Sequence, residues 1–239
     1  MNSVAIAVVG AASLVVSADA GVLVFSCFTR TASNGNTVID VFAVMSNASD
    51  RLLSVSNANL TTTQGGSTLS TYVQQVGTAT RGWKPDATTS TRSNIVDSFM
   101  TIGVDGGGPY GGEYYASAST TPDYYFTNWS VVASTVPALA GWYANPPILP
   151  DNLAESMSGM TGTRTNTGTA GSSNLGIWCA HLVMAPGTAS VFWGGTSAVK
   201  DGVTGATVTT TALATNLIPA PGALALLGLA GFSSRRRRA

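Results

Sequence analysis

Cys179 and His181 come closest to a catalytic pair in this sequence. Residues two apart on a strand share a face, and a thiol becomes a strong nucleophile when an imidazole lies within hydrogen-bond reach. On their predicted strand, His181 shares a face with Cys179. The opposite face carries Trp178, Ala180 and Leu182. No partner that would orient the imidazole is evident, so we expect a partly exposed structural histidine rather than a catalytic one.

The two cysteines, Cys27 and Cys179, leave two alternatives open. In an oxidising compartment they could pair and close a loop of about 150 residues. Such a disulfide would stabilise the fold by roughly 5 kcal/mol, because it lowers the entropy of the unfolded chain. Otherwise they are two buried free thiols. Two cysteines and one histidine cannot supply the four ligands of a zinc site. We therefore expect no metal and no cofactor.

Carboxylates are scarce, because Glu113 and Glu155 are the only glutamates and nine aspartates are scattered along the chain. A glycosidase needs two carboxylates about 5 to 9 Å apart, and no spacing in the sequence indicates such a pair. The sequence therefore predicts that the chain is not an enzyme, with a secreted hydrolase as an alternative.

Tyrosines and tryptophans cluster between Tyr110 and Tyr143, largely in predicted loops. Flat rings beside Asn and Asp can hold a sugar by stacking and hydrogen bonding. The opposing interpretation places Trp129 and Trp142 in the core, with the tyrosines capping the loops. The residues that would stack on a sugar are Tyr110, Tyr114, Tyr115, Trp129, Trp142 and Tyr143.

The elements that must position these residues are predicted to be strands. Apolar residues alternate at period two between Gly, Pro, Asn and Asp, the pattern of half-buried strands. On one such strand Ile39, Val41, Ala43 and Met45 share a face, with Asp40 opposite. Candidate strands lie near residues 22–29, 37–46, 51–57, 70–76, 95–104, 124–133, 175–184, 188–194 and 206–213.

About nine strands with little helix predict an all-β fold, a single β-sandwich-like domain over residues 21–217. A short helix is predicted around Asn152 to Met157, where Asn152 and Glu155 have capping-box spacing. Low-complexity stretches at 61–67, 77–94, 105–112 and 158–173 are predicted to be loops.

Charged residues make up only 9% of the 239 residues, against about 25% in an average protein. Without the terminal Arg235, Arg236, Arg237 and Arg238 and without Asp19, seven of the eleven basic and ten of the eleven acidic residues remain, a net charge of −3. Nucleic-acid binding needs clustered Lys and Arg, so this composition excludes it. Thr, Ser, Asn and Gly replace the charges, which favours an exported protein.

The N-terminal segment has the pattern of a secretory signal peptide. Residues 4–16 are small or apolar, and Ala18-Asp19-Ala20 follows with small residues at both positions that a signal peptidase reads. Cleavage is predicted between Ala20 and Gly21, which makes residues 1–20 a signal peptide helix. The n-region lacks Lys and Arg, and the alternative is a buried first element of a cytosolic domain.

Residues 218–239 form a distinct tail. Pro219, Ala220 and Pro221 precede eleven apolar or Gly residues at 222–232. As a helix this stretch is only about 17 Å long, short for a permanent transmembrane helix. The four closing arginines would stop transfer across a membrane. The tail is therefore predicted to hold the chain in a membrane transiently, with an ordinary C-terminal anchor as the alternative.

The order Pro-x-Pro, short apolar helix and terminal arginines resembles the PEP-CTERM sorting signal of Gram-negative bacteria that make exopolysaccharide. The matching residues are Pro219, Ala220 and Pro221 with the four terminal arginines, and Ala220 stands where the family pattern has Glu. The resemblance implies cleavage by exosortase, a membrane-embedded cysteine transpeptidase, after passage through the secretion machinery.

The sequence and this resemblance together predict an exported protein of the cell envelope or extracellular matrix of a Gram-negative-type bacterium. Its role would be structural or adhesive, in contact with exopolysaccharide. A carbohydrate-binding module that uses the aromatic cluster is the first alternative, and the secreted hydrolase is the second.

Overall fold

The computed structural model describes residues 22–64, 67–69, 72, 91–103, 140–143, 153–166, 173–186 and 190–216. Every regular element in these ranges is a β-strand, which confirms the all-β prediction. Within the same ranges there is no helix of the length and apolarity that crossing a membrane requires. The predicted signal peptide, the predicted C-terminal tail and the predicted strand at 124–133 lie outside the described residues.

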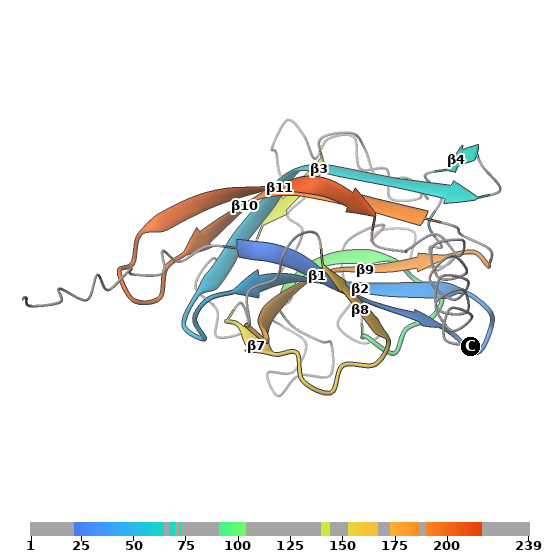
Figure 1. The fold of residues 1–239 in the computed structure, drawn as a ribbon, viewed down its shortest axis with the longest axis horizontal. Coiled ribbons are helices and arrows are strands. Elements are labelled where there is room, and N and C mark those ends of the chain that lie inside the picture. Colours follow the sequence, from blue (N-terminus) through green and yellow to red (C-terminus); the bar gives the residue numbers. More distant parts are fainter. Residues whose placement is uncertain are drawn as a thin grey trace, which may run out of the picture.

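The first of two antiparallel sheets has the strand order β5-β9-β2-β1-β8, and the short strand β7 also pairs with β9. It forms the lower layer in Figure 1. Its strands are β1 (Val22–Thr31), β2 (Thr37–Met45), β5 (Phe99–Gly103), β7 (Glu155–Ser156), β8 (Thr163–Asn166) and β9 (Leu175–Met184).

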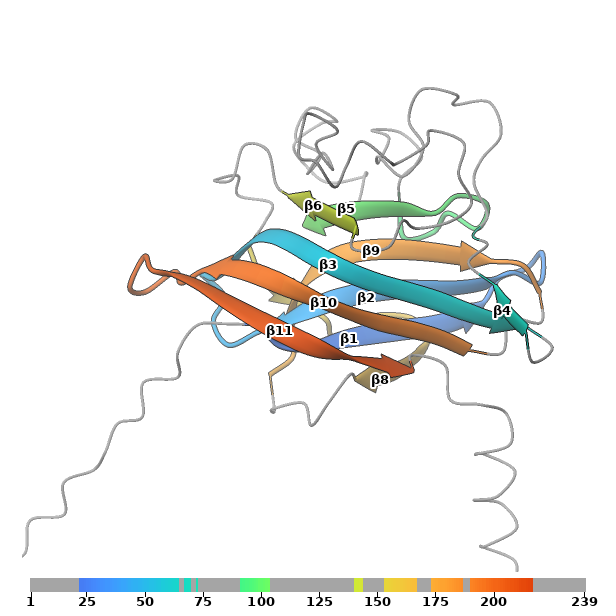
Figure 2. The same cartoon turned by 90° about the horizontal axis from the view of Figure 1, so that it is seen from above.

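The second antiparallel sheet has the order β11-β10-β3-β4, with β6 pairing to β3. Figure 2 shows β3, β10 and β11 running across the strands of the first sheet. Its strands are β3 (Arg51–Gln64), β4 (Ser67–Leu69), β6 (Ala140–Tyr143), β10 (Ser190–Lys200) and β11 (Thr207–Asn216).

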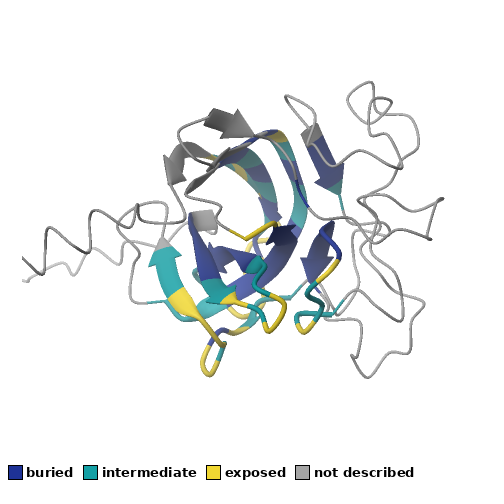
Figure 3. Ribbon diagram, turned by 90° about the vertical axis from the view of Figure 1, so that its right-hand side faces the viewer, coloured by how far each residue is buried: buried dark blue, intermediate teal, exposed yellow. Residues whose placement is uncertain are grey.

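The facing sides of the two sheets share one hydrophobic core. In Figure 3 many residues of the strands around this core are coloured as buried. Side chains alternate along a strand, and β2 places Ile39, Val41, Ala43 and Met45 in this core, as predicted. Aromatic rings join the layers: the centroids of Phe25 in β1 and Trp193 in β10 lie 5.4 Å apart in an edge-on contact. The two sheets therefore form one packed unit.

Three predicted elements are wrong where the structure describes them. The predicted loop at 61–67 contains the end of β3 and the start of β4, and the predicted loop at 158–173 contains β8. The predicted helix around Asn152 to Met157 is extended, because Leu153 bridges to Arg51 and Glu155–Ser156 form β7 against β9. Pairing with a neighbouring strand overrides a local capping signal, which is a weak preference.

A bulge in β9 also changes the predicted faces of that strand. Val41 pairs with Ala180 but Phe42 pairs with Trp178, so Cys179 is the extra residue on β9. An extra residue reverses the alternation beyond it. Cys179 and Ala180 both contact the inner core, whereas Trp178 belongs to a second apolar cluster. This second cluster lies on the outer face of the first sheet, the face turned away from the second sheet.

Candidate functional site

A buried cluster of charged groups lies on the outer face of the first sheet and is formed by Arg30, Asp40 and His181. The strand order β9-β2-β1 places one member on each of three neighbouring strands. Asp40 and His181 are directly paired in the β2–β9 ladder. Arg30 lies two residues beyond Phe28, the partner of Asp40 on β1, a diagonal position within reach of a long side chain.

Asp40 accepts hydrogen bonds on both carboxylate oxygens. Its Oδ1 lies 2.6 Å from Nδ1 of His181, and its Oδ2 lies 2.5 Å from Nη1 of Arg30. The side chains of His181 and Asp40 are 0% and 5% exposed, so both groups have left water. A carboxyl group this deeply buried requires hydrogen-bond partners, and the Arg30 guanidinium and the His181 ring supply them.

The second ring nitrogen of His181 is also occupied. Nε2 lies 3.0 Å from the carbonyl oxygen of Asn94, and a carbonyl can only accept. The ring is stacked on Phe99, with centroids 4.9 Å apart, and meets Trp178 edge-on at 5.9 Å. The imidazole is therefore enclosed on its faces and bonded at both nitrogens.

These contacts use both nitrogens of the His181 ring. Nε2 donates to the Asn94 carbonyl, which can only accept. Nδ1 is bonded to Oδ1 of Asp40, and the Arg30 guanidinium donates to Oδ2. His181 and Arg30 are thus joined through the two oxygens of one carboxyl group.

The cluster also fastens the segment at 91–97 to the sheet. Nη2 of Arg30 donates to the carbonyl oxygen of Arg92. The guanidinium of Arg92 lies 5.7 Å from the Trp178 ring centroid, within cation–π range, and its Nη1 lies 3.2 Å from Glu155 Oε1. The side-chain oxygen of Asn94 accepts from the amides of Val96 and Asp97 at 2.8 and 2.9 Å, which shapes the turn that presents its carbonyl to His181.

The Asp40–His181 pair resembles the orienting half of a hydrolase triad in its geometry only. In such a triad the second imidazole nitrogen takes the proton of a nucleophile. Here that nitrogen is bonded to the Asn94 carbonyl, and His181 is 0% exposed. The arrangement can hold a strand pair and a turn together, but it cannot reach a substrate. The prediction of a partly exposed histidine is wrong, because a covering segment and an ion pair enclose the ring.

The two cysteines are free and buried, which is the second of the two alternatives. Strand β2 lies between β1 and β9, so two strand spacings of about 4.8 Å separate the cysteine backbones. A disulfide tolerates at most about 7 Å between Cα atoms. The sheet order therefore does not allow a disulfide between Cys27 and Cys179.

The thiols are poor nucleophiles in this environment. Burial raises the pKa of Cys27 to about 11 and raises the pKa of Cys179 well above its ordinary value, whereas the reactive form is the thiolate. Cys179 Sγ donates to the Val41 carbonyl at 3.2 Å on the inner face. His181 lies on the outer face, so the bulge separates the two residues that the sequence placed together.

Of the predicted sugar-stacking residues, the structure describes Trp142 and Tyr143. Trp142 is 1% exposed, donates from Nε1 to the Thr101 carbonyl at 3.2 Å, and meets the Trp193 ring edge-on. It is a core residue and not a sugar-stacking one. Tyr143 is half-buried and packs against the same core. Tyr110, Tyr114, Tyr115 and Trp129 lie outside the described residues.

The other predicted site residues also lie outside the described ranges. They are Ala18, Ala20 and Gly21 at the predicted signal cleavage, Pro219, Ala220 and Pro221 in the tail, and Arg235, Arg236, Arg237 and Arg238 at its end. Among the residues that the structure does describe, no group of three or more His, Cys, Asp or Glu side chains could hold a metal ion.

Sequence reasoning missed Arg30, Asp40 and Asn94 as partners of His181. The available signal was an aspartate at an outward position within an apolar strand, together with a single histidine at a comparable position on another strand. That signal becomes informative only once β2 and β9 are known to be neighbours. In comparisons with protein-family models, curated proteins and solved structures, nothing matches this chain.

Proposed function

We propose that this chain is a non-enzymatic, exported protein of the cell envelope or extracellular matrix with a structural or adhesive role. The enclosure of His181 is the observation that carries the non-enzymatic part. The only histidine of the chain is 0% exposed and bonded at both nitrogens. The two cysteine thiols are also buried, and their pKa values are raised. His181 and both thiols therefore have structural roles inside the fold.

The route of export is proposed from the two ends of the sequence. A signal peptide helix at 1–20 would direct the chain to the secretion machinery and be cut after Ala20. A tail at 218–239, with Pro219-Ala220-Pro221 and the terminal arginines, would anchor it transiently in the membrane until an exosortase-like enzyme cuts it. A single β-sandwich over 21–217 would then remain as the mature protein in a Gram-negative-type bacterium.

The outer surface of the second sheet supports the proposal that the protein contacts hydrated polymers such as exopolysaccharide. Residues 207–211 read Thr-Val-Thr-Thr-Thr on β11, and Thr209 and Thr211 are exposed. The hydroxyls of Thr196 and Thr211 lie 3.1 Å apart across β10 and β11. Such cross-strand hydroxyl pairs stabilise a sheet without charge. A carbohydrate-binding module built on the aromatic cluster is less well supported, because Trp142 is buried.

The proposal is tested by intact-mass spectrometry of the protein recovered from membrane and extracellular fractions of its native cells. We expect an extracellular species that begins at Gly21 and ends between Pro219 and Gly222. A species in the membrane fraction that keeps Arg235 to Arg238 would contradict the exosortase part and indicate a plain tail anchor. A species that keeps Met1 in the cytosol would contradict export altogether.

A further inference from the structure

Strand β11 forms one edge of the second sheet, and no strand that the structure describes pairs with its outer side. Figure 2 shows β11 as the outermost strand on one side of that sheet. An edge strand presents a row of unpaired N–H and C=O groups to which another chain can bond. Thr207, Thr209 and Thr211 are exposed, and Val208 and Thr210 are half-buried. The first half of β11 therefore lies at the surface.

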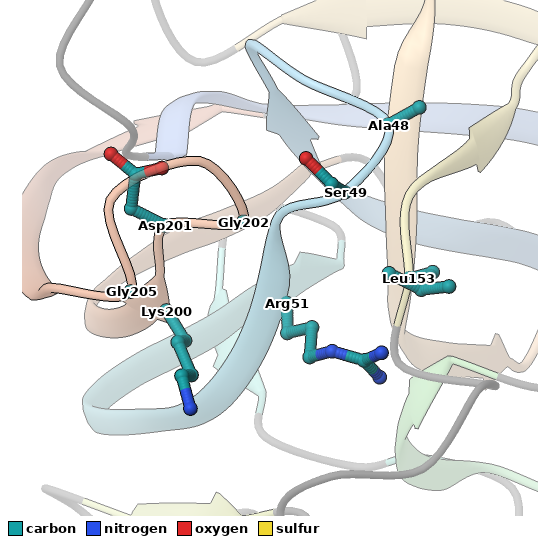
Figure 4. Close-up of a pocket in the computed structure, with 8 residues that line it drawn as sticks. All are labelled: Ala48, Ser49, Arg51, Leu153, Lys200, Asp201, Gly202 and Gly205. Atoms are coloured by element: carbon teal, nitrogen blue, oxygen red, sulfur yellow. The ribbon is translucent and has the colours of Figure 1, made fainter.

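The turn between β10 and β11 fixes the register of this edge. The Asp201 amide donates to the Ala206 carbonyl at 2.8 Å, and Oδ1 of Asp201 accepts from two further amides of the turn at 2.6 and 3.0 Å. Figure 4 shows Asp201, Gly202 and Gly205 in this turn, beside a hollow that they help to line. Asp201 and Ala206 are thus a hydrogen-bonded pair at the start of the β10–β11 ladder.

The ladder then determines which backbone groups of β11 point outward. Its register runs without a shift over residues 207–212, and hydrogen-bonded pairs alternate with non-bonded pairs along antiparallel strands. Counting from the bonded pair at the turn, the N–H and C=O groups of Val208 and Thr210 point toward β10. The Ser197 hydroxyl on β10 donates to the Thr210 carbonyl at 3.2 Å, as expected for a carbonyl on that side. The outward-pointing groups belong to the alternate residues Thr207, Thr209 and Thr211.

The other edge strands in the described ranges are protected against pairing with another chain. β4, β6 and β7 have two to four residues, and a very short edge offers little to pair with. β5 is buried at all five positions, and the four residues of β8 include the charged Arg164. Residues 207–211 of β11 contain no charge, no proline and no register shift. This segment therefore lacks the devices that keep an edge strand unpaired.

Residues 207–211 are also complementary to a second copy of themselves. In an antiparallel pair with a two-fold axis at Thr209, Thr209 lies opposite its own copy and Thr207 lies opposite Thr211. All three outward-bonding positions thus meet threonines, and Thr–Thr pairs stabilise neighbouring strands. Thr196 and Thr211 already form such a pair within one chain, with hydroxyl oxygens 3.1 Å apart. A two-fold pair uses one edge of each chain and closes, whereas a filament needs two different open surfaces.

We propose that residues 207–211 of β11 are a self-association edge, at which two copies of this chain join their second sheets into one antiparallel sheet. The row of threonine hydroxyls on the outer surface then continues from one chain into the other. The inference does not depend on export or tail cleavage, because it uses only residues of the folded domain.

The pairing is tested by amide hydrogen exchange, followed by NMR on the purified protein at low and high concentration, with sedimentation equilibrium to measure its mass. We expect a dimer at high concentration in which exchange at Thr207, Thr209 and Thr211 is slowed, because these amides become bonded across the two-fold axis. The amides of Val208 and Thr210, which bond to β10, should exchange slowly in monomer and dimer alike. A protein that stays monomeric at high concentration would overturn the proposal. If its outward amides were protected nevertheless, another segment of the same chain would be the occupant of the edge.

Three variants of one residue test whether the backbone of β11 forms the contact. Thr209→Pro removes an outward amide without removing a bond to β10, so it should weaken dimerisation about tenfold or more, because two symmetry-related hydrogen bonds are lost. Thr209→Ala keeps the amide and should dimerise within about threefold of the parent. Thr209→Lys places two like charges at the axis and should weaken dimerisation less in high salt.

Slow exchange at Val208 and Thr210 in each variant would show that the β10–β11 ladder is intact. A Thr209→Pro variant that dimerises as the parent does, or a Thr209→Lys variant that does so in low salt, would overturn the proposal. Either result would leave the mass-spectrometric test of export unaffected.

Discussion

The two faces of the first sheet are both buried, but they are stabilised in different ways. The inner face of β2 presents Ile39 and Val41 to the hydrophobic core shared with the second sheet. The outer face presents Phe42 to a smaller apolar cluster and Asp40 to the side chains of Arg30 and His181. The stability that the inner face contributes depends on the apolar area removed from water. The stability that the outer face contributes depends also on the pairing of a buried charged group, so we expect the outer face to tolerate substitution much less.

The largest expected effect is that of Asp40→Asn. This change removes the carboxylate that pairs with the Arg30 guanidinium and bonds the His181 ring, and breaking a buried ion pair costs about 3 to 5 kcal/mol of unfolding free energy. Urea denaturation measures the loss. As a control, the double variant Asp40→Asn with His181→Asn should lose at least about 1 kcal/mol less than the two single variants added together. If the losses of the two single variants simply add up in the double variant, Asp40 and His181 do not stabilise each other, and the outer face does not depend on their pairing.

The inner face has its own sensitivity, which is to alkaline pH. The pKa of Cys27 is about 11 in the folded chain against 9.0 for an ordinary thiol, so above pH 9 the unfolded state loses a proton that the folded state keeps. Stability should therefore fall as pH rises from 9 to 11, by about 3 kcal/mol at most for this group.

Urea midpoints at pH 8, 9, 10 and 11 measure this alkaline loss, and a Cys27→Ala variant should show a flatter decline. Both thiols should also resist alkylation at pH 9 until the chain is unfolded. Rapid alkylation of the native protein would contradict the burial of Cys27 and Cys179.

A smaller effect is expected for Ile39→Val, next to Asp40 on the same strand but on the inner face. Removing one buried methyl group costs about 1 kcal/mol. Urea denaturation should therefore find a loss several times smaller than that of Asp40→Asn. Equal losses at the two neighbouring positions would remove the distinction between the faces.

The smallest effect is expected at the rim of the outer face. Glu155 pairs with Arg92 at 3.2 Å, but its side chain is 41% exposed. An exposed ion pair contributes at most about 1 kcal/mol and is screened by salt. Glu155→Gln should therefore shift the urea midpoint little, and less still in 0.5 M salt. A loss as large as that of Asp40→Asn would mean that the rim is as desolvated as the cluster.

The inner face could be predicted from the sequence, because the period-two pattern at Ile39, Val41, Ala43 and Met45 is local. The outer face could not. Asp40 and His181 are 141 positions apart, and their contact depends on which strands become neighbours. The bulge at Cys179 arises from the pairing of β9 with β2, so no pattern along the chain marks it.

Short edge strands were the other failure of sequence reasoning. β8 (Thr163–Asn166) is polar throughout and pairs only with β1 in the described structure. A strand of four polar residues has no alternation to detect. Near Glu155, a local capping signal competed with pairing to β9, and the long-range pairing prevailed.

The central claim is that His181 is enclosed in the fold and hydrogen-bonded at both ring nitrogens, so that it holds the outer face together. Because the chain has one histidine, nitrogen-edited NMR of the ¹⁵N-labelled protein gives a single set of imidazole signals. The account predicts a slowly exchanging N–H proton on Nε2, bonded to the Asn94 carbonyl, that disappears when urea unfolds the chain. Rapid exchange of this proton with water in the folded state would contradict the account and make the imidazole available for chemistry.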